Sequence, residues 1–157
     1  MRPILNFVNK SPNPDPTYSD NDNSGFDLRA WIEENNGGII MKPLERKLIH
    51  TGLYFELPID CEFRTEIQVR PRSGMAIKKG LTVINTPGTI DEGYTGEICV
   101  LLVNLSNEDV VIENGDRIAQ AVLCPVLNGN CTMLRKVEEI NKVTKRGDGG
   151  FGHSGTK

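Results

Sequence analysis

Residues 81–103, LTVINTPGTIDEGYTGEICVLLV, are the stretch around which the rest of the chain can be interpreted. Leu81–Asn85 and Ile98–Val103 are rich in β-branched and aliphatic side chains, which favours two strands. Pro87 and three glycines punctuate the segment between them, so we expect a hairpin. Because glycine lets a ligand approach the main chain closely, this bend suggests a pocket built partly from backbone groups. Taken alone, an ordinary glycine-rich turn is the alternative.

Segments on both sides of this hairpin alternate apolar and polar residues and predict further short strands. They are FDLRAW at 26–31, IIMKPLERKLIHTGLYFELP at 39–58, CEFRTEIQVRP at 61–71, and residues 110–112, 117–123 and 131–137. In the third of these, we expect Phe63, Thr65, Ile67 and Val69 to share the core face.

One short helix is predicted at 73–80, SGMAIKKG, with Ser73 as its N-terminal cap and Gly80 as its end. About ten short strands with one brief helix predict an all-β fold, a sandwich or barrel of the jelly-roll type.

Composition limits the class of protein. A chain of 157 residues suits one domain, which buries roughly 70% of its unfolded surface. A hydrophobic fraction of 38% and a net charge of −3 indicate a globular protein without the basic surface that nucleic acid requires. The longest apolar run, Ile98–Val103, is far shorter than the ~20 residues that span a bilayer. We expect no membrane partner, no signal peptide and a cytoplasmic location, whereas a small phosphorylated ligand fits.

Four cysteines, at positions 61, 99, 124 and 131, lack the Cys-x-x-Cys spacing of a zinc site. Only His50 and His153 could complete such a site. We therefore expect reduced thiols in or near the core.

Two motifs suit a phosphorylated ligand, and a third, GFDLRA, adds a carboxylate in a strand after the proline-rich loop. PRSGMA at 71–76 places Arg72, Ser73 and Gly74 at a helix N-terminus, where backbone N–H groups can bind phosphate. GDRIAQ at 115–120 contributes Gln120, while its Asp116 and Arg117 are expected to have a structural role, paired with each other or with a neighbouring subunit. GFDLRA at 25–30 contributes Asp27. A plain helix cap and a surface carboxylate are the alternatives for the first and third motifs.

The central bend carries polar groups that suit a planar base joined to a sugar: the amide of Asn85, the carboxylate of Asp91 and the ring of Tyr94. Glu92 and Glu97 are expected on solvated faces of the hairpin.

The last segment, RGDGGFGHSG at 146–155, combines Arg146, Phe151, His153 and Ser154 on a glycine-rich chain. Such an arm could close over a nucleotide, and a disordered tail is the alternative. We therefore divide the chain into a folded domain at 1–140 and a glycine-rich arm at 141–157.

These five motifs, in this order, resemble those of the trimeric dUTP pyrophosphatases (dUTPases), and the resemblance spans Gly25–Gly155. It implies a distorted jelly-roll, or β-clip, homotrimer with active sites shared between subunits. The implied reaction is hydrolysis of dUTP to dUMP and pyrophosphate by water attack on the α-phosphorus. This reaction limits uracil incorporation into DNA and supplies dUMP for dTMP synthesis.

The resemblance also implies residue roles. Asn85, the backbone of Thr89 and Ile90, and the main chain at Cys99 would read uracil. Tyr94 would pack under deoxyribose, and Asp91 would contact the sugar and orient the attacking water. The residues implied to contact phosphate are Arg72, Ser73, Gly74 and Gln120, and those of the closing arm are Arg146, Phe151, His153 and Ser154. Mg²⁺ would bind through the triphosphate and water, with Asp27 linked to its water shell.

Two other functions were considered. A dCTP deaminase shares the fold, but the resemblance would then require glutamate where this chain has Leu101. A noncatalytic trimer would lack Asp91 or the arm, and both are present. The tail departs from the common family pattern by placing His153 before Ser154, which leaves the γ-phosphate contacts open.

Overall fold

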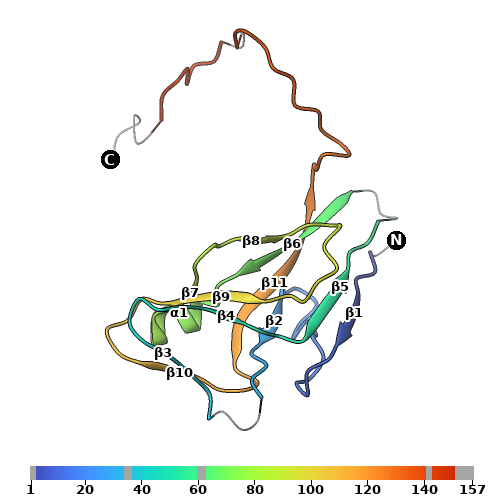
Figure 1. Ribbon diagram of the computed structural model, residues 1–157. Helices are drawn as coiled ribbons and strands as arrows, with labels where there is room; N and C mark the ends of the chain where they lie inside the picture. The colour runs from blue at the N-terminus through green and yellow to red at the C-terminus, as the bar shows by residue number, and fades with distance from the viewer. Residues whose placement is uncertain (1–2, 34–36, 60–62, 141–142, 151–157) are drawn as a thin grey trace.

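The computed structural model describes residues 3–33, 37–59, 63–140 and 143–150, and these contain eleven strands and one helix (Figure 1). The strands are β1 (Asn6–Asn9), β2 (Phe26–Arg29), β3 (Ile39–Met41), β4 (Arg46–Ile49), β5 (Leu53–Glu56), β6 (Arg64–Arg70), β7 (Leu81–Val83), β8 (Gly88–Ile90), β9 (Val100–Asn104), β10 (Val110–Ile112) and β11 (Arg117–Val126). The helix α1 (Ser73–Lys79) lies between β6 and β7. The predicted all-β fold with one short helix is confirmed.

The strands pair antiparallel in four small sheets, in the orders β1–β5, β3–β10, β4–β9–β7 and β2–β11–β6–β8. The largest sheet alternates as predicted: Thr65, Ile67 and Val69 on β6 are buried. Phe63 was wrongly assigned to this core face, because β6 begins only at Arg64 and Phe63 is 59% exposed. Among the described residues, no helix is long and apolar enough to cross a bilayer.

The predicted hairpin at 81–103 is confirmed in part. β7 and β9 pair antiparallel, with Val83 opposite Leu102. The bend between them, however, contains β8, which pairs with β6 in the other sheet through Gly88 opposite Val69. The segment therefore crosses from one sheet to another and returns, and it opens a space between the two sheets.

Helix α1 has the predicted bounds but not the predicted cap. Arg72 occupies the N-cap position and makes no side-chain capping hydrogen bond, and Ser73 is already the first helical residue. The N-cap is the residue just before the first helical residue, and Ser73 is itself the first helical residue. The predicted role of Ser73 as N-cap is therefore wrong. Gly80 ends the helix as expected, with φ of 66° and its N–H bonded to the carbonyl of Ala76.

The strand predicted at 131–137 is wrong. β11 ends at Val126, and the N–H groups of Cys131 and Thr132 then bond to the carbonyl of Asn128 in a turn. After this turn the chain runs away from the sheets (Figure 1). Residues 131–140 are exposed, and in the described part of the chain no strand pairs with them. Alternation alone does not make a strand without such a partner.

Asn104, at the end of β9, is fully buried and uses its whole amide. Its Nδ2 donates to the carbonyls of Met41 and Glu108, and its Oδ1 accepts from the N–H and hydroxyl of Ser106. One side chain thus ties β9 to β3 and to the loop before β10.

Replacing Asn104 with Ala should lower the free energy of unfolding by about 2 to 4 kcal/mol, because the carbonyl of Met41 and the N–H of Ser106 lose the partner that the buried amide supplies. Urea denaturation measures the change. Asn107→Ala, at an exposed position in the same loop, is the matched control. Equal losses in the two variants would contradict the structural role of Asn104.

Candidate active site

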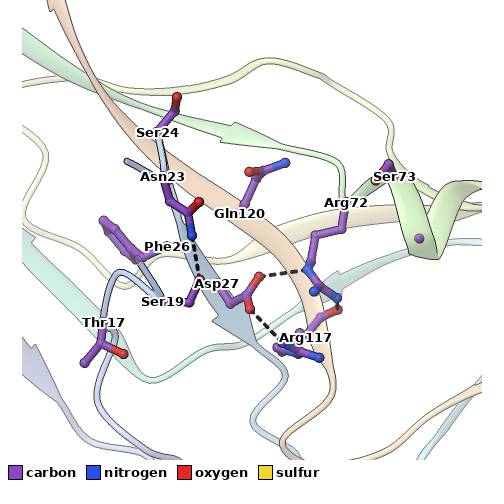
Figure 2. Close-up of a pocket in the computed structure, with 12 residues that line it drawn as sticks. Thr17, Ser19, Asn23, Ser24, Phe26, Asp27, Arg72, Ser73, Arg117 and Gln120 are labelled. Carbon is purple, nitrogen blue, oxygen red and sulfur yellow. Dashed lines mark hydrogen bonds and ion pairs between the residues drawn. The ribbon is translucent and has the colours of Figure 1, made fainter. Parts of the chain in front are cut away.

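The first cavity, of about 430 Å³, lies between the loop before β2, the start of α1 and strand β11 (Figure 2). Its walls include Thr17, Ser19, Asp27, Arg72, Ser73, Gly74, Arg117 and Gln120. The sheet order explains this gathering, since β11 lies between β2 and β6 and Gln120 stands opposite both Asp27 and Arg70. All four residues predicted to contact phosphate therefore line one cavity, together with Asp27.

Asp27 organises this cavity, because its carboxylate lies between two guanidinium groups (Figure 2). One oxygen is 2.7 Å from Nε of Arg72, and the other is 3.3 Å from a terminal nitrogen of Arg117. Arg72 also donates to the carbonyl of Arg117, and Gln120 to that of Pro71. Guanidinium, amide and hydroxyl donors in one hollow make an anion-binding site.

Arg117 is a site residue that the sequence analysis missed. We expected it to pair with Asp116 or with a neighbouring subunit, but Asp116 accepts from the N–H of Glu113 and lies near Lys79 instead. Strict alternation would put Arg117 and Gln120 on opposite faces of β11. A β-bulge between Arg117 and Ala119 reverses the alternation and turns both toward the cavity. The apolar pair at 118–119 does not single out this bulge, because Ala121–Val122 on the same strand is also an apolar pair.

The second cavity, of about 260 Å³, lies where β8 separates from β7 and β9. The residues predicted to read the base line it: Asn85, Thr89, Ile90 and Cys99. Gly88 lines it too, as does Tyr94, which was predicted to pack under the sugar. The remaining walls come from Leu48 on β4, Val69 on β6, Leu101 on β9, and Glu97. Apolar walls, exposed peptide groups and one amide side chain suit a flat polar ring.

Two contacts fix polar side chains at this cavity. A Cβ atom added at Gly88 would lie 3.1 Å from Nδ2 of Asn85, so the amide lies directly against β8. Tyr94 donates its hydroxyl to the carbonyl of Glu97 at 2.9 Å, and its ring covers Gly96 so closely that a side chain there would collide with it.

Glu97 is held inside the structure, so its predicted place on a solvated face is wrong. Its side chain is 17% exposed; Oε1 accepts from the N–H groups of Thr51 and Gly52, and Oε2 lies 2.8 Å from Nδ1 of His50. Burial alone would raise the pKa of Glu97, but the hydrogen bonds from His50, Gly52 and Thr51 outweigh it and lower the pKa below its usual value. These partners are some 45 residues away in sequence, and no local pattern could have indicated them.

Glu92 is also held by partners rather than solvated. Its side chain is 12% exposed and binds Arg64 at 3.3 Å and the amide of Asn128 at 3.2 Å. The predicted thiols are free at the three described positions: Cys99 and Cys124 are half-buried, but Cys131 is exposed and lies outside the core. Cys61 lies outside the described residues. Burial, with the nearby charge of Glu97, raises the pKa of the Cys99 thiol to about 11.

Asp91 lies in neither of these cavities. It is exposed just after β8 and lines a third hollow with Glu92, Gly93 and Asn128. Within the described residues, its carboxylate makes no hydrogen bond or ion pair. Arg146 is exposed and donates to the carbonyl of Gly149, and it lines none of the three cavities. The other predicted arm residues, Phe151, His153 and Ser154, lie outside the described residues.

The first cavity suits an anion that carries a metal better than a bare metal ion. Both oxygens of Asp27 already face guanidinium groups, and the other polar groups around it are mainly donors. Mg²⁺ prefers oxygen ligands and retains several of its waters. The residues present therefore fit a magnesium ion that is held through a bound anion and water rather than by direct protein ligands.

The fold and these cavities define a class: an all-β protein of the distorted jelly-roll type with a separate anion site and a base-sized pocket. Comparisons with known proteins agree. A family model described as dUTPase matches residues 11–155. The deoxyuridine 5'-triphosphate nucleotidohydrolase of Finegoldia magna is 48% identical over 151 residues, 96% of this chain and 98% of that protein. That of Treponema denticola is 54% identical over 140 residues, 89% of this chain and 90% of that protein.

Among solved structures, the dUTPase of Staphylococcus bacteriophage 80alpha with dUPNHPP is similar, with a TM-score of 0.79 and 27% identity over 97% of this chain and 98% of that one. The chain belongs to the dUTPase family.

Replacing Glu97 with Gln should lower the free energy of unfolding by about 2 kcal/mol at pH 7, because the charged acceptor of two N–H groups is lost. Since folding lowers the pKa of Glu97, this stabilisation is present above the ordinary value of 4.5 and is lost as the pH falls through the lowered pKa. Urea denaturation across this pH range, in buffer with chelator, measures the difference in free energy of unfolding between wild type and Glu97→Gln. This difference should shrink as the pH falls. Glu113→Gln, at an exposed position, is the control. If Glu97→Gln loses no more free energy of unfolding than Glu113→Gln at any pH, Glu97 does not stabilise the fold as described.

Proposed function

We propose that this chain hydrolyses dUTP to dUMP and pyrophosphate. The observation that carries the proposal is the gathering of the predicted phosphate contacts in one cavity and of the predicted base contacts in another, within a chain of the dUTPase family. A base pocket and a polyphosphate site together select a nucleoside triphosphate.

Uracil would lie in the cavity beside β8. The main chain at Thr89, Ile90 and Cys99 lines this cavity and would supply hydrogen-bond donors and acceptors to the ring, and Asn85 would add its side-chain amide. Tyr94, 44% exposed at the mouth of this cavity, would pack under the deoxyribose and leave no room for a 2′-hydroxyl. Recognition by paired hydrogen bonds penalises a base with the wrong donor pattern, because buried partners would stay unmatched.

The triphosphate would lie in the first cavity. Arg72, Ser73, Gly74 and Gln120 line it and would contact phosphate oxygens, and Arg72 would exchange Asp27 for phosphate as its acceptor. Mg²⁺, bound to the triphosphate and to water, would neutralise part of the phosphate charge. Asp91 would orient the water that attacks the α-phosphorus. The glycine-rich arm at 141–157, with Arg146, Phe151, His153 and Ser154, would close over the bound nucleotide.

On one chain the two cavities have no lining residue in common. We infer that each active site is assembled from several copies of the chain. The family resemblance implies a trimer. One copy would supply the base pocket with Asp91, and its neighbour the phosphate site. Leu48 and Leu101, opposite each other on β4 and β9, are 52% and 38% exposed and offer apolar surface for such contacts.

Pyrophosphate release from dUTP should exceed release from dCTP, dTTP and UTP, and chelator should abolish it.

Asp91→Asn should lower kcat by about 10²- to 10⁴-fold, because a positioned base contributes that much, and leave KM nearly unchanged. Asp109→Asn, also exposed, is the matched control. Wild-type turnover in Asp91→Asn removes that residue from the mechanism, and equal rates on all four nucleotides remove the substrate assignment.

Subunit sharing can be tested by mixing two inactive variants. Asp91→Asn damages the proposed base half and Arg72→Ala the phosphate half, so co-assembly at equal amounts should restore about one quarter of the sites by random pairing. Arg72→Ala mixed with Gln120→Ala is the control, because every phosphate half is then damaged. Failure of the first mixture to recover, or equal recovery in the control, contradicts sites shared between copies.

A further inference from the structure

A cluster of three metal-binding side chains lies at the edge of the base pocket. Nδ1 of His50, Oε2 of Glu97 and Sγ of Cys99 all lie within 4.8 Å of one another. Glu97 and Cys99 also line the second cavity, whereas His50 faces solvent with 57% of its side chain exposed. The proposed hydrolysis uses only the main chain of Cys99, so these three side chains have no part in it.

The spacing of the three atoms is close to that of a tetrahedral zinc site. Zinc bonds of about 2.0 Å to nitrogen and 2.3 Å to sulfur put these ligands about 3.5 Å apart, and Sγ of Cys99 is 3.6 Å from Nδ1 of His50. The 2.8 Å between His50 and Oε2 of Glu97 would have to open by about 0.5 Å to admit the ion. The exposed His50 ring is free to make that small rotation.

The backbone around the cluster is fixed in advance. Glu97 is anchored through its other oxygen by the N–H groups of Thr51 and Gly52, which leaves Oε2 to bind a cation. The carbonyl of His50 accepts from the N–H of Trp31, and the N–H of Ile98 donates to the carbonyl of Leu53. Outer contacts that orient the ligands in this way raise the affinity of metal sites.

The ligand types select the cation. One imidazole, one carboxylate and one thiolate favour a borderline divalent ion such as Zn²⁺ over Mg²⁺, which prefers oxygen alone. Three protein ligands leave the fourth tetrahedral position open to water. We propose that His50, Glu97 and Cys99 bind Zn²⁺ at the edge of the base pocket, and that the bound ion and its water hinder entry of the base. The proposed zinc binding stands on geometry alone, whereas the proposed competition with the base rests on the proposed function.

The metal half is tested with Co²⁺, a spectroscopic substitute for Zn²⁺, added to the full chain after chelator treatment. Wild type should develop a thiolate-to-cobalt absorption band that Zn²⁺ removes. Cys99→Ser should lose the band, and His50→Gln, at an exposed position that the fold tolerates, should bind Co²⁺ more than about tenfold more weakly.

Cys124→Ser and Cys131→Ser are the matched controls, since both remove a free thiol elsewhere, and both should keep the wild-type band. No band in wild type, or the same band in Cys99→Ser, overturns the site.

The competition half is tested with dUMP, which carries one phosphate and chelates Zn²⁺ far less than a triphosphate does. By calorimetry, wild type should bind dUMP more weakly with Zn²⁺ than without it. Zn²⁺ should not change the affinity of Cys99→Ser for dUMP. Equal binding to wild type with and without Zn²⁺ overturns competition. If the proposed function fails instead, dUMP does not bind under either condition while the Co²⁺ band persists, so the two failures are distinguishable.

Discussion

The pairing of β8 with β6 is the interaction on which the proposed base pocket depends, and it joins that pocket to the sheet that carries the phosphate site. If β8 paired with β7 or β9, the segment at 81–103 would be an ordinary flat hairpin without a cavity. Because Gly88, Thr89 and Ile90 instead align with Val69, Gln68 and Ile67, the chain leaves one sheet and joins another. The base pocket is the space opened by that crossing.

The same sheet carries the phosphate site at its other end. β6 runs from its contact with β8 toward Pro71 and α1, and β11 brings Gln120 and Arg117 alongside Asp27 of β2. The two cavities are thus built on one rigid frame but do not share a lining on one chain. We propose that copies share sites because a nucleotide must hold its base and its phosphates at once, and the two cavities have no lining residue in common.

Sequence patterns predicted the parts of the structure that local chemistry controls. Alternation identified β2 and β6, because each buries one face, and glycine identified the end of α1. β11 was also predicted, although its buried residues do not alternate. Motifs identified the residues gathered in both cavities. The prediction that the side chain of Glu97 is solvated failed, because its partners Thr51 and Gly52 come from a distant turn. The prediction for Arg117 failed because a bulge in β11 changed its face, and the strand at 131–137 failed for lack of a partner.

The central claim is that one nucleotide spans two copies of this chain. A crystal structure with a nonhydrolysable dUTP analogue and Mg²⁺ tests it most directly. The account predicts uracil against Asn85 and β8 of one copy, and the triphosphate against Arg72 and Gln120 of another. An analogue whose base and phosphates both contact a single copy would contradict the account.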